Sequence, residues 1–291
     1  MPSLFIGLVS HEGSRFAENQ GEAGLAMILA ASWREHGFPC EVEVNTQDAF
    51  DPALQTITGT SVWRAVRTQL RLERSWRAYL REGTAVSIAG RARSWLSDGV
   101  VHVQAIRRYW RPWIGEGHPG HSSFRMIQRL FNIEFSHRHL MESGLASGSD
   151  WILIIEDDAS CADIPECVSG LLGIIEDFPE CGYVNVSESF TASELGITHL
   201  LQPTGKDWRG HTSRQVWMSP RPVTNTVCAI LYRREFLNSL VDELTRLPMN
   251  PIVPIDWKVN IALRDLYLRG ALSSSDCLIV TPAPIDQLSM R

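Results

Sequence analysis

The stretch Trp151-Ile152-Leu153-Ile154-Ile155-Glu156-Asp157-Asp158 consists of five apolar residues followed by three carboxylates. An uninterrupted apolar run of this length predicts a strand that is covered on both faces, as in many α/β proteins. In an open α/β sheet, ligands bind beyond the carboxyl ends of the strands, which is where the three acids fall. The stretch therefore predicts a fold class and the position of a functional site.

The segments around this strand alternate between strand and helix patterns. Leu4–Val9 and Glu41–Asn45 are expected strands, and a helix over about 22–36, with Gly37 as its stop signal, lies between them. Further helices are expected at Ser61–Arg81, Phe124–Leu145, Ile164–Asp177, Arg233–Leu247 and from Asp256 to Arg269, and further strands at Gly182–Val186, Asn225–Tyr232 and Cys277–Val280. This alternation predicts an α/β fold with a mostly parallel central sheet flanked by helices.

Two regions give weaker patterns. Thr84–Trp113 mixes β-like alternation at Val100 and Val103 with a basic and aromatic cluster at its end. Thr191–Pro222 is rich in Gly, Pro, Ser and Thr, which predicts loops. The helix at Phe124–Leu145 is expected to break at Gly144 or Gly148.

Composition narrows the class of protein. The 291 residues are 44% hydrophobic and 21% charged, and the formal net charge is −6, which argues against a general nucleic-acid binder. Six cysteines without a CxxC pair predict reduced thiols in a cytoplasmic protein. The N-terminus has no positively charged leader, and no apolar run approaches the roughly 18 residues of a membrane span. We expect a cytoplasmic protein with, at most, peripheral membrane contact.

The three acids at the strand end need a positive partner. In an extended chain, Glu156 and Asp158 face one side and Asp157 faces the other. A hard divalent cation such as Mn²⁺ or Mg²⁺ takes oxygen ligands, and a bound diphosphate can supply more ligands to the same ion. The alternative is a solvated turn whose acids favour a helix start.

The sequence also resembles glycosyltransferase family 25. The resemblance rests on Phe135-Ser136-His137-Arg138-His139-Leu140-Met141, on the stretch from Ala146 to the Glu156-Asp157-Asp158 step, on Thr226–Arg234, on Pro254-Ile255-Asp256-Trp257 and on Pro282–Ser289. It covers about half of the chain, mainly from residue 124 onward. It implies a GT-A fold, a UDP- or GDP-sugar donor and a divalent metal.

The resemblance and the acidic step together predict a metal-dependent glycosyltransferase. Asp158, helped by Glu156 or Asp157, would hold the metal on the donor diphosphate. Donor contacts are expected from Ser10, Arg15, Asn45, Asp48, Asp157 and His211, each of which also has an ordinary loop interpretation. We expect one domain over 1–291, with a donor half at about 1–160 and an acceptor half at about 161–291.

Asp256 is the expected catalytic base, which takes the proton of the acceptor hydroxyl in an inverting transfer. Its alternative role is that of an N-cap, since it follows Pro254 and precedes a helical pattern. The acceptor would be a saccharide, a lipid-linked molecule or a small molecule. His137 and His139, two residues apart, would lie on different helix faces and are expected to be core or hydrogen-bonding residues rather than to share a metal.

One face of the Ser61–Arg81 helix carries a stripe of arginines. Its members are Arg64, Arg67, Arg71, Arg74, Arg77 and Arg81. The stripe would suit an anionic lipid surface or an anionic acceptor, and a solvated helix face is the alternative.

Two other function classes remain open at this point. A nucleotidyltransferase also uses metal-bound carboxylates on an α/β sheet, but the Ser10–Arg15 loop contains one Gly and one Arg, a poor match to a Gly-rich phosphate loop. A non-catalytic binding protein on a transferase-like fold is the second alternative. Transfer of a sugar, as opposed to release of pyrophosphate, separates the two enzymes.

Overall fold

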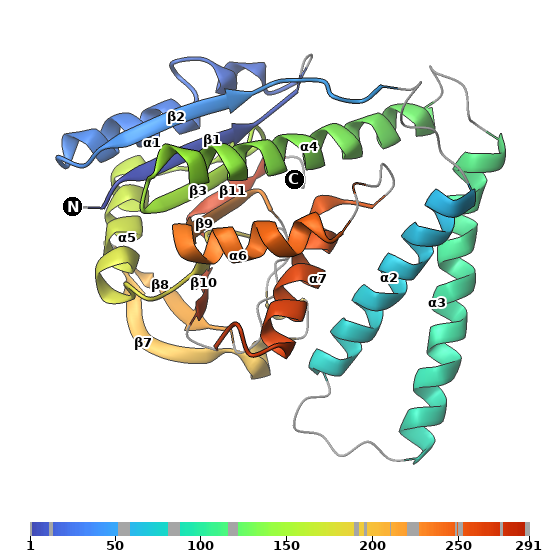
Figure 1. The fold of residues 1–291 in the computed structure, drawn as a ribbon. Coiled ribbons are helices and arrows are strands. Elements are labelled where there is room, and N and C mark those ends of the chain that lie inside the picture. Colours follow the sequence, from blue (N-terminus) through green and yellow to red (C-terminus); the bar gives the residue numbers. More distant parts are fainter. Residues whose placement is uncertain are drawn as a thin grey trace.

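The computed structural model describes residues 2–11, 14–51, 59–80, 88–115, 122–188, 192–194, 197–209, 211–219, 227–247, 249, 253–273 and 276–288. Its centre is an eight-stranded sheet with the strand order β2-β1-β3-β9-β5-β10-β8-β7 (Figure 1). The strands are β1 Leu4–Val9, β2 Cys40–Asn45, β3 Trp151–Glu156, β5 Tyr183–Asn185, β7 Gln202–Trp208, β8 His211–Met218, β9 Ala229–Arg233 and β10 Cys277–Thr281. The expected α/β class is confirmed.

The sheet is mixed, which corrects the expectation of a mostly parallel one. β1 runs parallel to β2 and β3, and β5 runs parallel to β10. β9 is inserted between β3 and β5 and is antiparallel to both. The alternating pattern missed this because β9 follows the β7–β8 hairpin in sequence, whereas a parallel strand usually follows a crossover helix.

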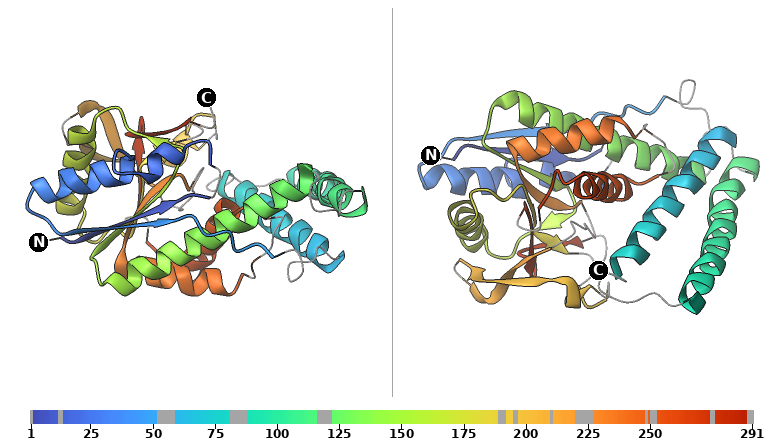
Figure 2. Two further views of the ribbon diagram at one scale, coloured as in Figure 1. Left: turned by 90° about the horizontal axis from the view of Figure 1, so that it is seen from above. Right: turned by 60° about the horizontal axis from the view of Figure 1, so that its bottom comes forward.

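Helices cover both faces of the sheet (Figure 2). The helices α1 Leu25–Glu35 and α5 Ile164–Asp177 share one core cluster with Leu4, Ile6 and Leu8 of β1. The helices α4 Ser122–Ser147, α6 Arg234–Thr245 and α7 Ile255–Leu268 share the other cluster with Phe5 and Val9. Successive side chains of a strand point to opposite faces, so one apolar strand supplies both cores.

Helix α4 lies close against β1 and β3 because two glycines make room for it. A Cβ on Gly7 of β1 would come within 3.0 Å of Leu140 of α4, and one on Gly144 of α4 would come within 2.8 Å of Ile152 of β3. The helix therefore continues through Gly144 and ends at Ser147, before Gly148 with its φ of +77°. Of the two expected stop positions, the structure selects the second, where only glycine is unstrained.

The two long helices α2 Gly59–Leu80 and α3 Ile88–Gly115 form a hairpin beside the sheet domain (Figure 1). Val62, Ala65 and Val66 of α2 pack in a third apolar cluster with Phe131 of α4, and Trp257 of α7 packs against it. The region Thr84–Trp113, whose sequence pattern is mixed, is helical over the residues of α3. Val100 and Val103 are three residues apart, which places them on one helix face, so helical spacing prevailed over their strand propensity.

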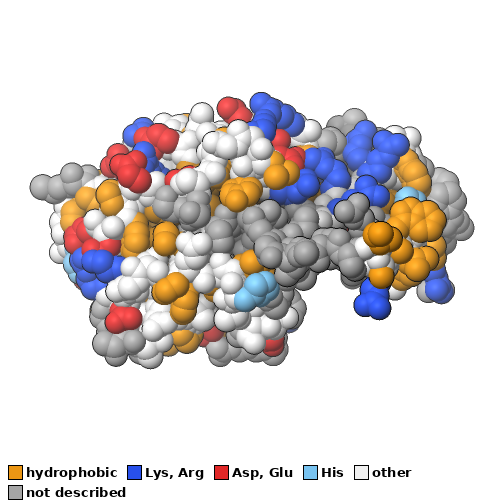
Figure 3. All heavy atoms as spheres, turned by 90° about the horizontal axis from the view of Figure 1, so that it is seen from below, with side chains coloured by type: hydrophobic (Ala, Val, Ile, Leu, Met, Phe, Trp, Pro, Cys, Tyr) orange, Lys and Arg blue, Asp and Glu red, His pale blue; other side chains and the backbone are white. Residues whose placement is uncertain are grey.

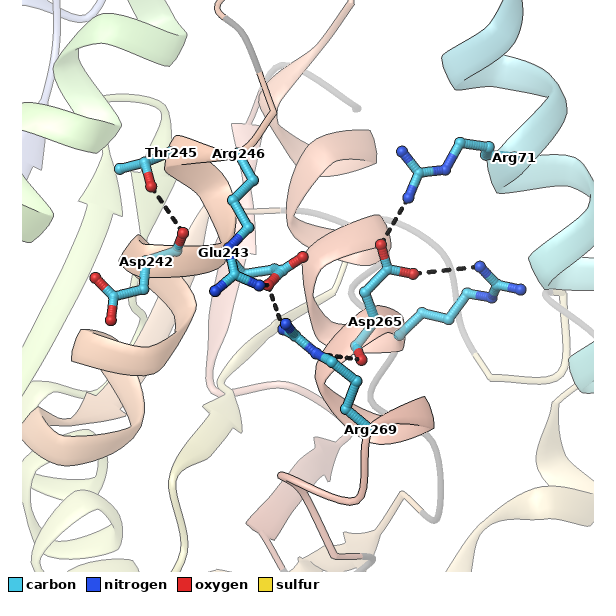
Figure 4. Close-up of polar contacts among 8 residues, drawn as sticks. Arg71, Asp242, Glu243, Thr245, Arg246, Asp265 and Arg269 are labelled. Atoms are coloured by element: carbon cyan, nitrogen blue, oxygen red, sulfur yellow. Dashed lines mark hydrogen bonds and ion pairs between the residues drawn. The ribbon is translucent and has the colours of Figure 1, made fainter.

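An ion pair links the hairpin to α7. Arg71 of α2 points toward Asp265 of α7, and its Nη2 lies 2.6 Å from Oδ2 of the carboxylate (Figure 4). Arg269 of α7 pairs with Glu243 of α6 in the same region. Arg71 therefore bridges two helices, while 48% of its side chain stays exposed on the arginine stripe.

The expected loop over Thr191–Pro222 contains the β7–β8 hairpin at the sheet edge. Its register shifts between Pro203 and Asp207, around Gly205 with a φ of +74°. The Gly and Pro residues thus mark an irregular edge strand, a position that tolerates both. Short elements complete the chain: β4 Ala159–Ser160, β6 Ser187–Glu188, β11 Ile285–Gln287, η1 Ala17–Gln20 and η2 Thr198–Leu200.

Among the helices described, none is both long enough and apolar enough to cross a membrane.

Candidate metal-binding site

The acidic step lies where several elements end together. β1 and β3 are parallel and in register, so that Val9 is opposite Glu156, and the loops that follow both strands leave the same edge of the sheet. β11 pairs with β4 so that Gln287 is opposite Ala159, and the Leu288 N–H donates to the Asp158 carbonyl at 2.8 Å. The C-terminal segment thus returns to cover the acids.

The carboxylates divide between two sides, as the geometry of an extended strand predicts. Ligand atoms of Glu156, Asp158 and Cys228 all lie within 4.8 Å of one another. Asp157 turns the other way, and its Oδ2 accepts a hydrogen bond of 2.5 Å from the Ser10 hydroxyl. Glu156 and Asp158 therefore form a pair, whereas Asp157 binds the loop after β1.

Uncharged side chains hold the converging pair. The Gln287 amide donates to Glu156 Oε2 and to Asp158 Oδ2, at 3.3 Å in each case, and so bridges the two carboxylates. The Cys228 thiol donates to Asp158 Oδ1 at 3.8 Å. Burial, followed by the nearby Glu156 charge, raises the pKa of Cys228 well above its usual value, so the sulfur stays protonated.

His137 supports Glu156 from the opposite side. Its ring is buried on α4, and Nε2 lies 3.1 Å from Glu156 Oε1. His139, on a different face of α4, contacts Glu43 at 3.0 Å instead. The expectation that the two histidines form separate hydrogen bonds is confirmed.

The loop after β1 is tied to Asp157. The Gln20 amide donates to the Ser10 hydroxyl oxygen at 2.6 Å, and that hydroxyl in turn donates to the Asp157 carboxylate. The Asn19 amide donates to the Asp157 carbonyl at 2.6 Å. These bonds fix the backbone from which the Glu156 and Asp158 carboxylates project.

A cleft of about 260 Å³ opens beside the acids. Its lining residues are Val9, Ser10, His11, Arg129, Leu130, Ile133, Glu156, Asp157, Asp158 and Gln287. The volume is close to the lower end of the range for small-molecule sites. One wall carries the acids and α4 adds Arg129, so the lining combines an anionic patch with a cation.

The residues fit a hard divalent cation. Glu156 and Asp158 offer carboxylate oxygens, the ligand type that Mg²⁺ and Mn²⁺ prefer. A protonated thiol is a poor ligand for such an ion, so Cys228 serves better as the hydrogen-bond donor that orients Asp158. Two protein carboxylates would leave the remaining coordination positions for water or phosphate oxygens.

Asp256 lies close to this pair without lining the cleft. It is the second residue of α7, and Pro254 occupies the N-cap position, so the alternative of Asp256 as the N-cap is wrong. Its Oδ1 accepts from the Trp257 N–H at 2.9 Å. Burial, with a smaller contribution from the Glu156 charge, raises the pKa of the Asp256 carboxyl to about 6. A carboxyl of this kind is ionised, yet poorly solvated, near neutral pH.

The other expected donor contacts lie elsewhere. Arg15 lies over the Phe16 ring, 4.7 Å from its centroid. Asn45 is buried and its Oδ1 accepts from the Gln47 N–H. Asp48 accepts from Gln128 and Asn132 of α4. None of these three belongs to the described lining of the cleft.

His211 was also expected to contact the donor. It is the first residue of β8, and its side chain lies outside the described part of the structure. Its role as a phosphate contact stays a prediction.

A second charged cluster lies between α4 and α7, and the sequence did not predict it. Glu134 and Lys258 are fully buried and pair with each other, and Arg138 pairs with Glu134 at 2.8 Å. Arg138 also donates to the carbonyls of Leu244 and Leu247 at the end of α6. Burial lowers the pKa of Lys258 to about 8, against the opposing effect of Glu134. The cluster joins α4 to α7, the helices that carry His137 and Asp256.

The sequence reasoning also missed Arg129, Cys228, Gln287 and the role of His137. His137, Cys228 and Gln287 each gave one signal, since each falls in a stretch that resembles glycosyltransferase family 25, whereas Arg129 lies outside those stretches. A comparison with models of known protein families finds no match, and a search of curated proteins finds no similar sequence. The resemblance therefore rests on the quoted stretches.

Proposed function

We propose that this protein is a metal-dependent glycosyltransferase that moves a sugar from a UDP- or GDP-sugar to an acceptor hydroxyl. The observation that carries the proposal is the convergence of Glu156 and Asp158 at the end of β3, in a cleft that also contains Arg129. Oxygen ligands beside a cation suit a metal-bound diphosphate. We assign the domain to the GT-A class on the same grounds, together with the family 25 resemblance.

Each group has a defined part in the proposed reaction. Glu156 and Asp158 would hold Mn²⁺ or Mg²⁺, which offsets the negative charge that develops on the departing diphosphate. Arg129 adds a positive charge at the same cleft. As the bond between the anomeric carbon and the diphosphate breaks, the acceptor oxygen bonds to that carbon, and Asp256 takes the hydroxyl proton.

The pKa of about 6 suits Asp256 to this role, because the carboxylate is ionised at pH 7 to 8 and remains basic enough to accept a proton. The inverting outcome, the acceptor class (saccharide, lipid-linked or small molecule) and the cytoplasmic location belong to the proposal. All six cysteines are free thiols in the structure, which is compatible with a reducing compartment.

Calorimetry with UDP and GDP provides the first test. We expect one of the two to bind in Mn²⁺ or Mg²⁺ and to lose most of its affinity in EDTA. Incubation with the matching nucleotide sugars and an acceptor panel should then release the nucleoside diphosphate. Nucleotide binding that ignores the metal would overturn the metal role. Release of pyrophosphate from a nucleoside triphosphate and a sugar phosphate would assign the cleft to a nucleotidyltransferase.

A further inference from the structure

The α2–α3 hairpin has a charge that is opposite to that of the rest of the chain. Residues 59–115 contain eleven arginines and three acidic residues, so their formal charge is +8 in a chain whose total is −6. Such asymmetry is typical of a segment that meets an anionic surface. The metal site lies on the sheet, outside this segment, so the hairpin needs an explanation of its own.

One face of α3 is apolar and exposed. We call it the α3 stripe, and its members are Ile88, Trp95, Leu96, Val100 and Val103. Their exposed fractions run from 56% to 86%, which is unusual for large apolar side chains on one helix. Their spacing of three, four, seven and eight residues puts them on one side of the helix.

Arginines surround this apolar surface. In Figure 3 hydrophobic side chains gather over the hairpin at the right of the molecule, with blue arginine side chains around them. Among the side chains of α2 and α3 that the structure describes, the exposed charged ones are all arginines: Arg64, Arg67, Arg71, Arg74, Arg93 and Arg107. Arg71 pairs with Asp265 and fixes the hairpin, and the others leave the surface strongly basic.

We propose that the α2–α3 hairpin binds the surface of an anionic lipid bilayer through the α3 stripe and its flanking arginines. An amphipathic helix of this composition lies in the interface, with its apolar side chains below the headgroups and its arginines on the anionic lipids. Trp95 suits the headgroup level, where tryptophan is enriched. The helix lies on the bilayer and does not cross it, in agreement with its arginine content.

Two other partners, a second copy of the chain and a nucleic acid, fit the hairpin surface less well. A second copy of the chain would place the same basic surface against itself in a symmetric dimer, and like charges across an interface are costly. A nucleic acid would satisfy the arginines and leave five exposed apolar side chains without a partner. An anionic bilayer satisfies both parts of the surface.

Co-sedimentation of the full-length protein with vesicles tests the proposal. The probes are vesicles of phosphatidylcholine alone and of phosphatidylcholine with 30% phosphatidylglycerol. We expect the protein to pellet with the anionic vesicles only, and to be released as salt rises, because surface charge attraction is screened. Trp95→Ser/Leu96→Ser and Arg93→Glu/Arg107→Glu should each lower the partition coefficient by roughly tenfold or more.

Two control variants make the same kinds of change outside the hairpin. Ile28→Ser removes an exposed apolar side chain from α1, and Lys206→Glu/Arg209→Glu reverses two charges at the sheet edge. Both should bind vesicles like the wild type, and circular dichroism should show equal helix content in all variants. Equal losses in the control and hairpin variants would overturn the proposal.

One result would overturn the membrane proposal, and two further results would assign the hairpin to another role. Absence of pelleting at low salt ends the membrane proposal. If, in addition, a 20-nucleotide RNA binds tightly and Trp95→Ser/Leu96→Ser leaves that binding intact, the arginines serve a nucleic acid. If the free protein dimerises and the same variant makes it monomeric, the stripe is a contact between copies. These readouts need no enzyme activity, so the proposed function can fail while this proposal stands.

Discussion

Buried carboxylates occur at two places near α4, and their partners differ. In the buried cluster, Glu134 pairs with two cations, Arg138 and Lys258. At the strand end, Glu156 and Asp158 converge, an amide donates to both, a thiol donates to Asp158, and the His137 ring contacts Glu156. The first cluster is complete in itself, with opposite charges paired inside the protein.

The difference indicates what each cluster is for. A buried carboxylate paired with arginine and lysine stabilises the position of its helices and offers no free ligand. Two carboxylates held together by uncharged donors repel each other, and a divalent cation would remove that repulsion. The cleft beside the second cluster gives such an ion a route in. The comparison gives Glu134 a structural role and makes Asp158 the residue at which the proposed metal site can be tested.

Asp158→Asn gives the largest expected effect on the second cluster. The amide keeps the size and the acceptor oxygen but loses the charge, so Mn²⁺-linked binding of UDP or GDP should fall by at least about a thousandfold. Loss of a negative charge beside Glu156 should leave the metal-free protein equally stable or more stable. Calorimetry in Mn²⁺ and melting in EDTA measure the two results.

The matched control for this variant is Asp163→Asn. Asp163 is the N-cap of α5 and accepts from the Glu166 N–H, a role that Asn fills about as well. Wild-type metal affinity is expected for it. If Asp158→Asn binds nucleotide with Mn²⁺ as the wild type does, Asp158 is not a metal ligand.

Glu134→Gln removes the carboxylate of the first cluster. It leaves Lys258 and Arg138 without their shared carboxylate inside the protein, which should cost about 3–5 kcal/mol of unfolding free energy. Urea unfolding measures this cost. Glu235→Gln, which breaks an exposed pair with Arg233, is the control and should cost at most about 1 kcal/mol. Similar costs for both variants would contradict the structural assignment.

Asp256→Asn tests how burial changes the pKa of a single carboxyl. Because the pKa of Asp256 is about 6 in the folded protein and 3.8 ordinarily, the folded state holds its proton more tightly between pH 4 and pH 6. The wild type therefore loses stability as pH rises through this window. The Asn variant avoids the loss of about 3 kcal/mol, at 1.4 kcal/mol for each pKa unit.

The measurement is the difference in unfolding free energy between Asp256→Asn and the wild type, in EDTA. It should be near zero at pH 4 and favour the variant at pH 8. If Asp256 is also the base, turnover should fall by on the order of 10²–10⁴ in the same variant. A flat difference across pH would show that Asp256 is well solvated, and a variant with normal turnover would place the base elsewhere.

Much of the fold could be predicted because local patterns decide it. The apolar runs at Leu4–Val9 and Trp151–Ile155 and the amphipathic period of Ile164–Asp177 each specify one element. The insertion of β9 and the β7–β8 hairpin could not be predicted, since strand order depends on contacts between distant segments. Propensity also failed in α3, where Val100 and Val103 are helical.

The site was predictable only where its residues are consecutive. Glu156, Asp157 and Asp158 follow one strand, so their opposite orientations could be derived from strand geometry alone. Three further residues reach the same place from distant segments: His137 from α4, Cys228 from just before β9, and Gln287 from β11. Each falls in a stretch that resembles glycosyltransferase family 25, but their spacing in the sequence does not predict that they meet. Asp48 has acceptor oxygens of the expected kind, but it binds α4, a contact made across 84 residues.

Gln287→Ala gives the smallest expected effect and sharpens the comparison most. The Gln287 amide bridges Glu156 and Asp158, so its loss frees the carboxylates from their common donor without removing a ligand atom. Residues that orient metal ligands typically contribute 10- to 100-fold in metal affinity, and we expect a weakening of Mn²⁺ binding in that range. Gln20→Ala, which removes a donor to Ser10 on the Asp157 side, should change Mn²⁺ affinity less. Tighter Mn²⁺ binding in Gln287→Ala would mean that the amide competes with the metal for the two carboxylates. The Gln287 amide would then satisfy the strand-end carboxylates within the protein, as Arg138 and Lys258 satisfy Glu134.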